Sequence, residues 1–221
     1  VENMKVATQP LSSQTLCIDA IAATLGVTVS GGVFGNTYSY QWYKNTSNSI
    51  IGGKIIPFEN FENYIPTTTS IGEEYYYCRI NQVNSGCEVY SQPAKMVVVS
   101  PPIITTNPVS GGVCLGSVAK PLTVSYSNGA GVPSYQWYTT TSALPLVGNP
   151  ISGATNASFI PPSSSLGTFY YYCVISFTGS GCTAITSEVA KITVSTYPII
   201  SPMTVFTCSG VPFEIAPQDG T

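Results

Sequence analysis

The sequence predicts an all-β chain, made of two tandem antiparallel β-sandwiches and an incomplete start of a third β domain. Three short segments carry this prediction, because each returns 95 residues later in the chain. They are Tyr40-Gln41-Trp42-Tyr43 and 135–138, Tyr75-Tyr76-Tyr77-Cys78 and 170–173, and Ser85-Gly86-Cys87 and 180–182. A constant offset indicates one duplicated folding unit. We therefore expect units at residues 1–100, 101–196 and 197–221, with stiff proline-containing junctions between them.

Apolar and polar residues alternate with a period of two inside each unit, which marks β-strands. The expected strands span 24–30, 39–43, 75–83 and 95–99 in the first unit, and 120–126, 134–138, 170–178 and 191–194 in the second. Clusters of Gly, Asn, Ser and Pro separate these runs at short intervals, which is typical of a sandwich of short antiparallel strands. No window of the sequence predicts a convincing amphipathic helix.

Each unit also carries a tryptophan and, further along, a Tyr-x-Cys strand. In the first unit Tyr76 precedes Cys78 by two residues, and the second unit repeats the pattern. Immunoglobulin-like sandwiches place a buried Trp on the third strand, close to a strand with this tyrosine spacing. Strand alternation should put Tyr76 and Cys78 on the core face with Trp42, and Tyr77 on the opposite face. We therefore expect immunoglobulin-like domains, with Gly72 at the sharp corner before the strand.

The cysteines predict disulfides in an oxidising compartment. The chain has no His and no Cys-x-x-Cys pair, so the spacing does not favour a zinc site. Three cysteines fall in each full unit and one in the third: Cys17, Cys78 and Cys87; Cys114, Cys173 and Cys182; Cys208.

The pairing of these cysteines is open, because antibody domains place their first Cys roughly a dozen residues before Trp, and Val29 stands there in this chain. We favour Cys17–Cys78, with Cys114–Cys173 as its counterpart, because the two strand starts should lie at one end of a sandwich. The alternative is a bridge to Cys87, or to Cys182, in the last hairpin. The cysteines left over are expected to be buried thiols or to bridge to neighbouring units.

The composition argues against several classes of function. Charged residues make up 8% of the chain and the net charge is −3, with the few lysines scattered singly, so no basic surface for nucleic acid is expected. No apolar run is long enough to span a bilayer, so we expect no membrane insertion. Without His the commonest general base is missing, and carboxylates are too scarce for a calcium site. The second unit cannot build a glycosidase pair, and the adjacent Glu73 and Glu74 of the first are expected to lie on a solvated edge. We expect no catalytic residues, no metal and no cofactor.

Tyrosine is the positive chemical signal. Outward-facing tyrosines of the third and penultimate strands should form cross-strand aromatic ladders that stabilise each sheet. The alternative is a flat aromatic platform for sugars or another protein. Its candidate residues are Tyr43, Tyr77, Tyr138 and Tyr172.

Taken together, the Cys, Tyr-Gln-Trp-Tyr, Ile-Ser-Gly-Ala-Thr (151–155), Tyr-Tyr-Tyr-Cys and Ser-Gly-Cys segments resemble the immunoglobulin-like repeats of very large bacterial surface adhesins. These proteins are exported by type IX secretion and include the gliding-motility adhesin SprB. The resemblance covers about residues 8–195. The tail, with Cys208-Ser209-Gly210 and Phe213, is similar to the start of the PKD-like domains found in the same proteins. The first unit departs at 56–59, where the Ser-Gly-Ala-Thr segment is missing.

The resemblance implies a non-catalytic segment of a long adhesin that is secreted to the bacterial cell surface, outside the outer membrane. Such a segment would act as a spacer in gliding motility or surface attachment. Its expected partners are surface polysaccharide, another cell-surface protein and the neighbouring repeats of the same chain. Two alternatives stay open: an accessory binding module of a secreted polysaccharide-degrading enzyme, and a structural subunit of a surface filament.

Overall fold

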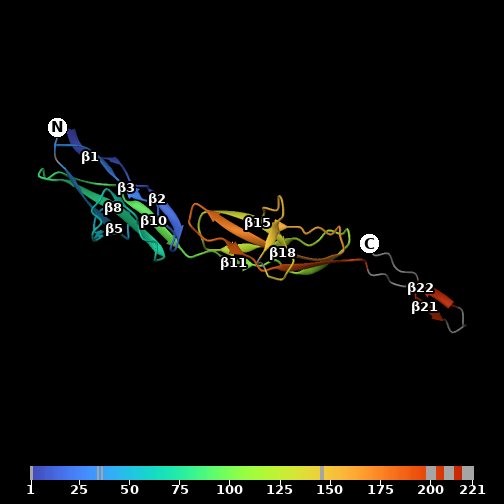
Figure 1. Ribbon diagram of the computed structural model, residues 1–221. Helices are drawn as coiled ribbons and strands as arrows, with labels where there is room; N and C mark the ends of the chain where they lie inside the picture. The colour runs from blue at the N-terminus through green and yellow to red at the C-terminus, as the bar shows by residue number, and fades with distance from the viewer. Residues whose placement is uncertain are drawn as a thin grey trace.

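The computed structural model confirms the predicted fold class. It describes residues 2–33, 35, 37–144 and 147–197, together with the backbone of two strands further on, and in these residues the regular structure is all β. Figure 1 shows two β-sandwiches arranged end to end along the chain. Among the described residues there is no helix long and apolar enough to cross a membrane.

The first sandwich has a six-stranded sheet. Five of its strands follow the order β2-β10-β8-β5-β6, and the sixth, β9, pairs with β8. Facing it lie the two-stranded pairs β1–β4 and β3–β7. Only Val27 separates β3 from β4, so these two strands are one extended run. The strands are β1 (Glu2–Thr8), β2 (Ser13–Cys17), β3 (Leu25–Gly26), β4 (Thr28–Gly32), β5 (Tyr38–Asn45), β6 (Lys54–Ile55), β7 (Asn63–Tyr64), β8 (Gly72–Gln82), β9 (Glu88–Tyr90) and β10 (Ala94–Val99).

The second sandwich repeats this topology. Its large sheet has the order β12-β20-β18-β15-β16, with β19 paired to β18, and the pairs β11–β14 and β13–β17 face it. The strands are β11 (Ile103–Thr106), β12 (Gly111–Cys114), β13 (Leu122–Thr123), β14 (Ser125–Ser127), β15 (Val132–Thr140), β16 (Gly148–Pro150), β17 (Ser158–Phe159), β18 (Gly167–Thr178), β19 (Ile185–Thr186) and β20 (Ala190–Ser195).

Of the expected third unit, the structure describes Tyr197 and the backbone of an antiparallel pair, β21 (Met203–Phe206) and β22 (Pro212–Ile215). The remaining residues of that unit, Cys208 among them, lie outside the described part of the chain.

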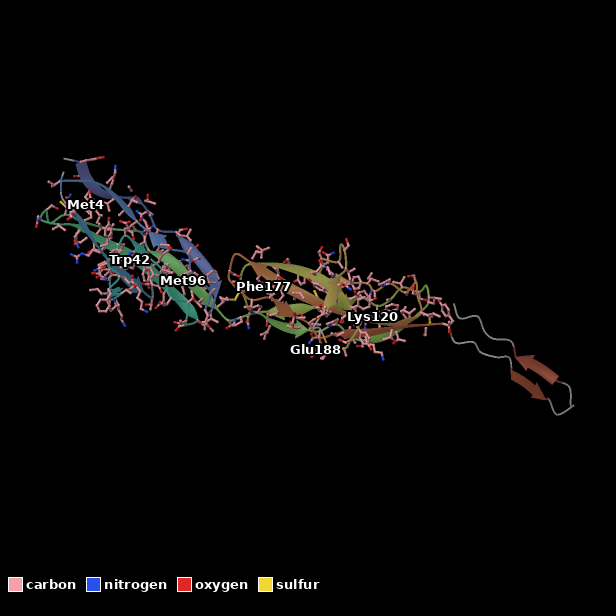
Figure 2. All side chains as sticks on the ribbon, viewed as in Figure 1. Met4, Trp42, Met96, Lys120, Phe177 and Glu188 are labelled. Carbon is pink, nitrogen blue, oxygen red and sulfur yellow. A yellow bond between two sulfur atoms is a disulfide. The ribbon has the colours of Figure 1, made fainter. Side chains whose placement is uncertain are left out.

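Each sandwich is built around its tryptophan. Trp42, labelled in Figure 2, is fully buried and lies opposite Cys78 in the β5–β8 register. Its indole N–H donates a hydrogen bond to the carbonyl of Phe61 at 2.9 Å, so the buried polar atom is satisfied. The ring of Tyr64 packs against it with centroids 5.6 Å apart. In the second sandwich Trp137 lies opposite Cys173, donates to the carbonyl of Asn156 at 2.9 Å and packs against the ring of Phe159.

The predicted face of the Tyr-x-Cys strand is confirmed. Tyr76, Cys78 and Ile80 are each at most 1% exposed and belong to the core of the first sandwich. Gly72, expected at the corner before the strand, is instead the first residue of β8, and it adopts a φ of 151°, which favours glycine. The hydroxyl of Tyr76 donates to Glu74 Oε2 at 2.6 Å.

We expect Trp137→Ala to destabilise the second sandwich by about 3–5 kcal/mol, because it deletes the largest fully buried ring of that core. Chemical denaturation followed by tyrosine fluorescence measures the change. Val147→Ala is the matched control, since Val147 is 84% exposed in the same sandwich, and it should change the free energy of unfolding by less than about 0.5 kcal/mol. Equal effects from the two substitutions would contradict the tryptophan-centred core.

Candidate functional site

The candidate site is the joint between the two sandwiches, where a disulfide connects Cys17 to Cys182. The two Cα atoms are 5.0 Å apart, within the usual range for a disulfide, although 165 residues separate the cysteines in the sequence. Cys17 ends β2 of the first sandwich, and Cys182 follows β18 of the second. The bridge therefore joins two domains and lies within neither.

The favoured bridge Cys17–Cys78 is wrong. Strand registers place Leu16 and Gly72 both opposite Val98, so Cys17 lies level with the very start of β8. Cys78 is six residues further along β8, about 20 Å away at roughly 3.3 Å per residue. A disulfide needs Cα atoms within about 7 Å.

The same register excludes Cys114–Cys173, and the bridges to the last hairpin within one unit do not form either. Among the described cysteines, Cys78, Cys87, Cys114 and Cys173 are unpaired. The favoured pairing leaves over Cys87 and Cys182, which were expected to be buried thiols or to bridge to neighbouring units. Cys182 does bridge to the neighbouring unit, whereas Cys87 is an exposed free thiol.

Backbone and side-chain hydrogen bonds hold the joint around the disulfide. The N–H of Cys17 donates to the carbonyl of Ser180 at 3.0 Å, which crosses from one sandwich to the other. The hydroxyl of Ser180 donates to the carbonyl of Ala130 at 2.7 Å, and the N–H of Ala130 contacts Cys182 Sγ at 3.2 Å. Ser180 is fully buried, and Cys17 and Cys182 are nearly so.

One glycine lies where the two sandwiches meet, and a second lies against the linker. Gly181 has a φ of 62°, and a Cβ placed on it would lie 2.5 Å from the Cβ of Ala20. Gly129 has a φ of 76°, and a Cβ there would lie 2.9 Å from the Cβ of Pro102. The N–H of Gly129 donates to the carbonyl of Ser100 at 3.0 Å, which ties the linker to the second sandwich. A larger side chain at Gly181 would push the domains apart, and one at Gly129 would displace the linker.

Sequence reasoning missed this joint, including Ser180 and Gly181 as residues of an interface. The sequence carried a partial signal, because the segment Ser-Gly-Cys recurs in both units with its serine and glycine kept beside the cysteine. The positions of the cysteines at opposite ends of each domain, which point to a contact outside it, come from the structure.

Cys78 and Cys173 are structural thiols. Each lies opposite the core tryptophan, and the N–H of Cys78 donates to Ser91 Oγ at 2.9 Å, as that of Cys173 does to Ser187 Oγ. Burial raises the pKa of the Cys78 thiol to about 12 and that of Cys173 to about 11. Both therefore stay protonated and unreactive near neutral pH, since the thiolate is the nucleophile.

The tyrosine platform requires a correction. Tyr77 is 2% exposed and Tyr172 is 5% exposed, so neither offers a ring face to a ligand. The segments around Gly53 and Gly148 cover them, and a Cβ on Gly148 would lie 2.7 Å from the hydroxyl of Tyr172.

The ladder interpretation agrees with the geometry. Tyr43 and Tyr77 lie opposite each other on β5 and β8, and their rings stack with centroids 5.2 Å apart and 4° between planes. Tyr138 and Tyr172 repeat the stack at 5.1 Å and 8°. Only the half-buried Tyr43 and Tyr138 retain contact with solvent among these four.

Two neighbouring carboxylates of the first sandwich, Glu73 and Glu74, are paired with lysines at its surface. Glu73 lies 2.8 Å from Lys95, whose hydrogen bond lowers the pKa of that carboxyl. Glu74 lies 3.0 Å from Lys44 and accepts from Tyr76; although partial burial works to raise its pKa, these hydrogen bonds outweigh it and the pKa is lowered. Both acids are therefore ionised ion-pair partners, which is unsuitable for a general acid. Over the described residues, no group of three His, Cys, Asp or Glu side chains is placed to hold a metal.

Comparisons with known proteins gave one family match and a set of similar solved structures. A family model described as a domain of unknown function, DUF8696, matches residues 105–196, which is the second sandwich. A search of curated proteins found no match. Among solved structures, the chain is similar to the fibronectin(III)-like modules of Clostridium thermocellum CbhA, with 10% identity, a TM-score of 0.40, and 87% of this chain and 94% of that chain covered.

Two further solved structures are similar at the same level. Titin domains I67–I69 share 15% identity, with a TM-score of 0.42 and coverage of 87% of this chain and 65% of that chain. Extracellular domains 3–5 of Drosophila OTK share 13% identity, with a TM-score of 0.34 and coverage of 93% and 71%. The immunoglobulin-like fold itself follows from the strand pairing described above.

Thiol labelling at pH 8 should separate the cysteines into three groups. In the folded, non-reduced chain we expect rapid alkylation of the exposed Cys87, slower alkylation of the half-buried Cys114, and protection of Cys78 and Cys173 until the chain is denatured. A peptide map without reduction should yield the Cys17 peptide joined to the Cys182 peptide. Recovery of a Cys17–Cys78 peptide would contradict the joint.

Proposed function

We propose that the chain is a non-catalytic spacer segment of a long cell-surface adhesin, which holds a contact region away from the cell under tension. The observation that carries this proposal is the Cys17–Cys182 disulfide, because it converts two small domains into one covalently closed unit. A disulfide of this kind persists in an oxidising, extracellular environment. The ion-paired carboxylates and the buried thiols support a mechanical role over a catalytic one.

The bridge changes how the chain responds to a pulling force. Force applied at the two ends passes through the disulfide, so the residues between Cys17 and Cys182 cannot be extended while it is intact. Both core tryptophans, Trp42 and Trp137, lie within this closed segment. A pulled segment of this kind keeps its length even when its domains unfold, which is the property that a spacer under load requires.

The finer part of the proposal rests on the resemblance to type IX secreted adhesins. It places the segment on the bacterial cell surface, outside the outer membrane, in gliding motility or surface attachment. The proposed partners are surface polysaccharide or another cell-surface protein. Because the rings of Tyr77 and Tyr172 are covered, we do not assign this contact to the tyrosine face.

Single-molecule force spectroscopy tests the spacer role. We expect the oxidised chain to withhold the 165-residue segment, and reduction to release up to roughly 55 nm of additional contour length at about 3.4 Å per residue. Cys182→Ser should behave as the reduced chain does, and Cys87→Ser, which leaves the bridge intact, should behave as the oxidised chain does. Full extension of the oxidised chain would rule out the mechanical part of the proposal.

Cell attachment under flow tests the adhesin assignment. In cells that make the full-length protein, we expect Cys17→Ser combined with Cys182→Ser to leave attachment at rest unchanged and to increase detachment under shear, because the joint becomes extensible. Cys173→Ala serves as the control for cysteine loss as such, because Cys173 is a buried free thiol that takes part in no bridge. If attachment under shear is unaffected, this segment does not transmit force in adhesion.

A further inference from the structure

The joint between the sandwiches has two halves, which the repeat places at opposite ends of each domain. We call the first half the socket; in the first sandwich it is the end of β2 with the following turn, 17–20. We call the second half the plug; in the second sandwich it is the turn 179–182 after β18. In the observed joint the socket of the first sandwich holds the plug of the second through Cys17–Cys182. Each sandwich therefore leaves one half unused: the plug of the first and the socket of the second.

The unused socket, 114–117 after β12, has the same backbone geometry as the occupied one. Cys17 lies opposite Val99 in the last strand, and Cys114 lies opposite Ser195. The next N–H donates to the last strand in both, at 3.0 Å from Ile18 to Val99 and at 2.8 Å from Leu115 to Ser195.

The turns that follow also match. The N–H of Ala20 donates to Cys17 at 3.2 Å, and that of Ser117 donates to Cys114 at 3.0 Å. An exposed apolar residue comes next in each unit: Ile21 is 90% exposed and Val118 is 87% exposed. Tyr197 contacts Ser117 at the unused socket, with their hydroxyl oxygens 2.6 Å apart, and the Cys114 thiol remains half-buried there.

The unused plug, 84–87, matches the occupied one in the same way. Asn84 and Gly86 have φ values of 64° and 68°, and their counterparts Gly179 and Gly181 have 81° and 62°. In both turns the serine hydroxyl accepts from the N–H of the cysteine, at 3.2 Å for Cys87 and at 3.5 Å for Cys182. Asparagine adopts positive φ more readily than most non-glycine residues, so Asn84 suits the turn conformation that Gly179 has in the occupied joint.

Burial is what distinguishes the used halves from the unused ones. Ser180 is fully buried and Cys182 is 8% exposed, whereas Ser85 is half-buried and Cys87 is exposed. Cys17 is 3% exposed, whereas its counterpart Cys114 is half-buried. The unused halves thus have the conformation of the joint without the partner that covers it.

We propose that Cys114 and Cys87 are the open halves of the same covalent joint, and that the partner of each is another immunoglobulin-like repeat of this type. Cys114 receives the Ser-Gly-Cys turn of one further repeat, and Cys87 enters the strand-end socket of another. Because each sandwich has its socket at one end and its plug at the other, the joint is directional and links repeats head to tail. The inference concerns how repeats connect, and it stands independently of the role in adhesion.

The bond forms by thiol–disulfide exchange with a small-molecule disulfide such as oxidised glutathione. One thiolate attacks the small disulfide and releases one small thiol; the second protein thiolate then attacks the mixed disulfide and releases the other. Two protein thiols are oxidised to one disulfide, and one small disulfide is reduced to two thiols. Cys78 and Cys173 are excluded from this exchange because both are buried in the cores.

Cys87 and Cys114 of one chain cannot join each other. Cys87 comes after the end of β8, whereas Cys17 lies level with the start of β8. Cys87 and Cys17 are therefore at opposite ends of the first sandwich. Cys182 and Cys114 are at opposite ends of the second sandwich by the same registers. Since Cys17 and Cys182 meet in the joint, Cys87 and Cys114 lie at the two outer ends, and a second copy of the chain can supply the partner for either.

Two single variants of the full chain test the pairing, each made with Cys208→Ser so that this cysteine cannot compete. Cys87→Ser retains an open socket, and Cys114→Ser retains an open plug. In a buffer of reduced and oxidised glutathione we expect each variant alone to stay monomeric and the mixture to form one disulfide-linked dimer. The chain with both cysteines should form a ladder of multimers, and Cys173→Ser in that chain should leave the ladder unchanged.

The expected preference is about tenfold for the mixed dimer over either self-paired dimer, which corresponds to about 1.4 kcal/mol. Mass spectrometry of the mixed dimer should identify a Cys87–Cys114 peptide, with Cys17–Cys182 intact in both copies. A mixture that stays monomeric, or self-paired dimers in equal yield, overturns the proposal. Circular dichroism of each variant confirms that both sandwiches are folded before the result is read.

Discussion

The structure depends on the pairing of tryptophan with cysteine across β5 and β8, and across β15 and β18. Because both residues are fully buried, a slip of one residue would turn a polar face into the core, so this contact determines the register of the central strands. The register of β8 with β10, and of β10 with β2, then places Cys17 at one end of the sandwich. The length of β8 places the Ser-Gly-Cys turn at the other end. Both halves of the joint follow from one core contact.

Three features could be predicted from the sequence: the sandwich, the buried tryptophans and the core face of the Tyr-x-Cys strand. Each depends on the alternation of apolar and polar residues within one short segment. The disulfide could not be predicted in the same way, since it depends on how two domains meet, and the partner of Cys17 lies 165 residues away. The burial of Tyr77 was missed for a related reason. Alternation correctly placed its side chain on the outer face of the sheet, but a loop around Gly53 covers that face.

The two sandwiches differ most in charge, and this difference has little effect on the fold. The first has ion pairs such as Arg79 with Glu88, 2.6 Å apart at the surface, whereas the second has few charged residues. Exposed ion pairs contribute about 0–1 kcal/mol each, which is small beside the burial of a tryptophan. The features that the two copies share are the core residues and both halves of the joint, which indicates that connection between domains is as much a property of the unit as its fold.

The joint also gives the chain a second covalent route between its domains. The peptide linker around Pro101-Pro102 is one route, and the Cys17–Cys182 bond is the other. A protease that cuts the linker would therefore leave the two sandwiches covalently attached through the disulfide. For a protein exposed to extracellular proteases, cleavage between domains would then release nothing until the disulfide was also reduced.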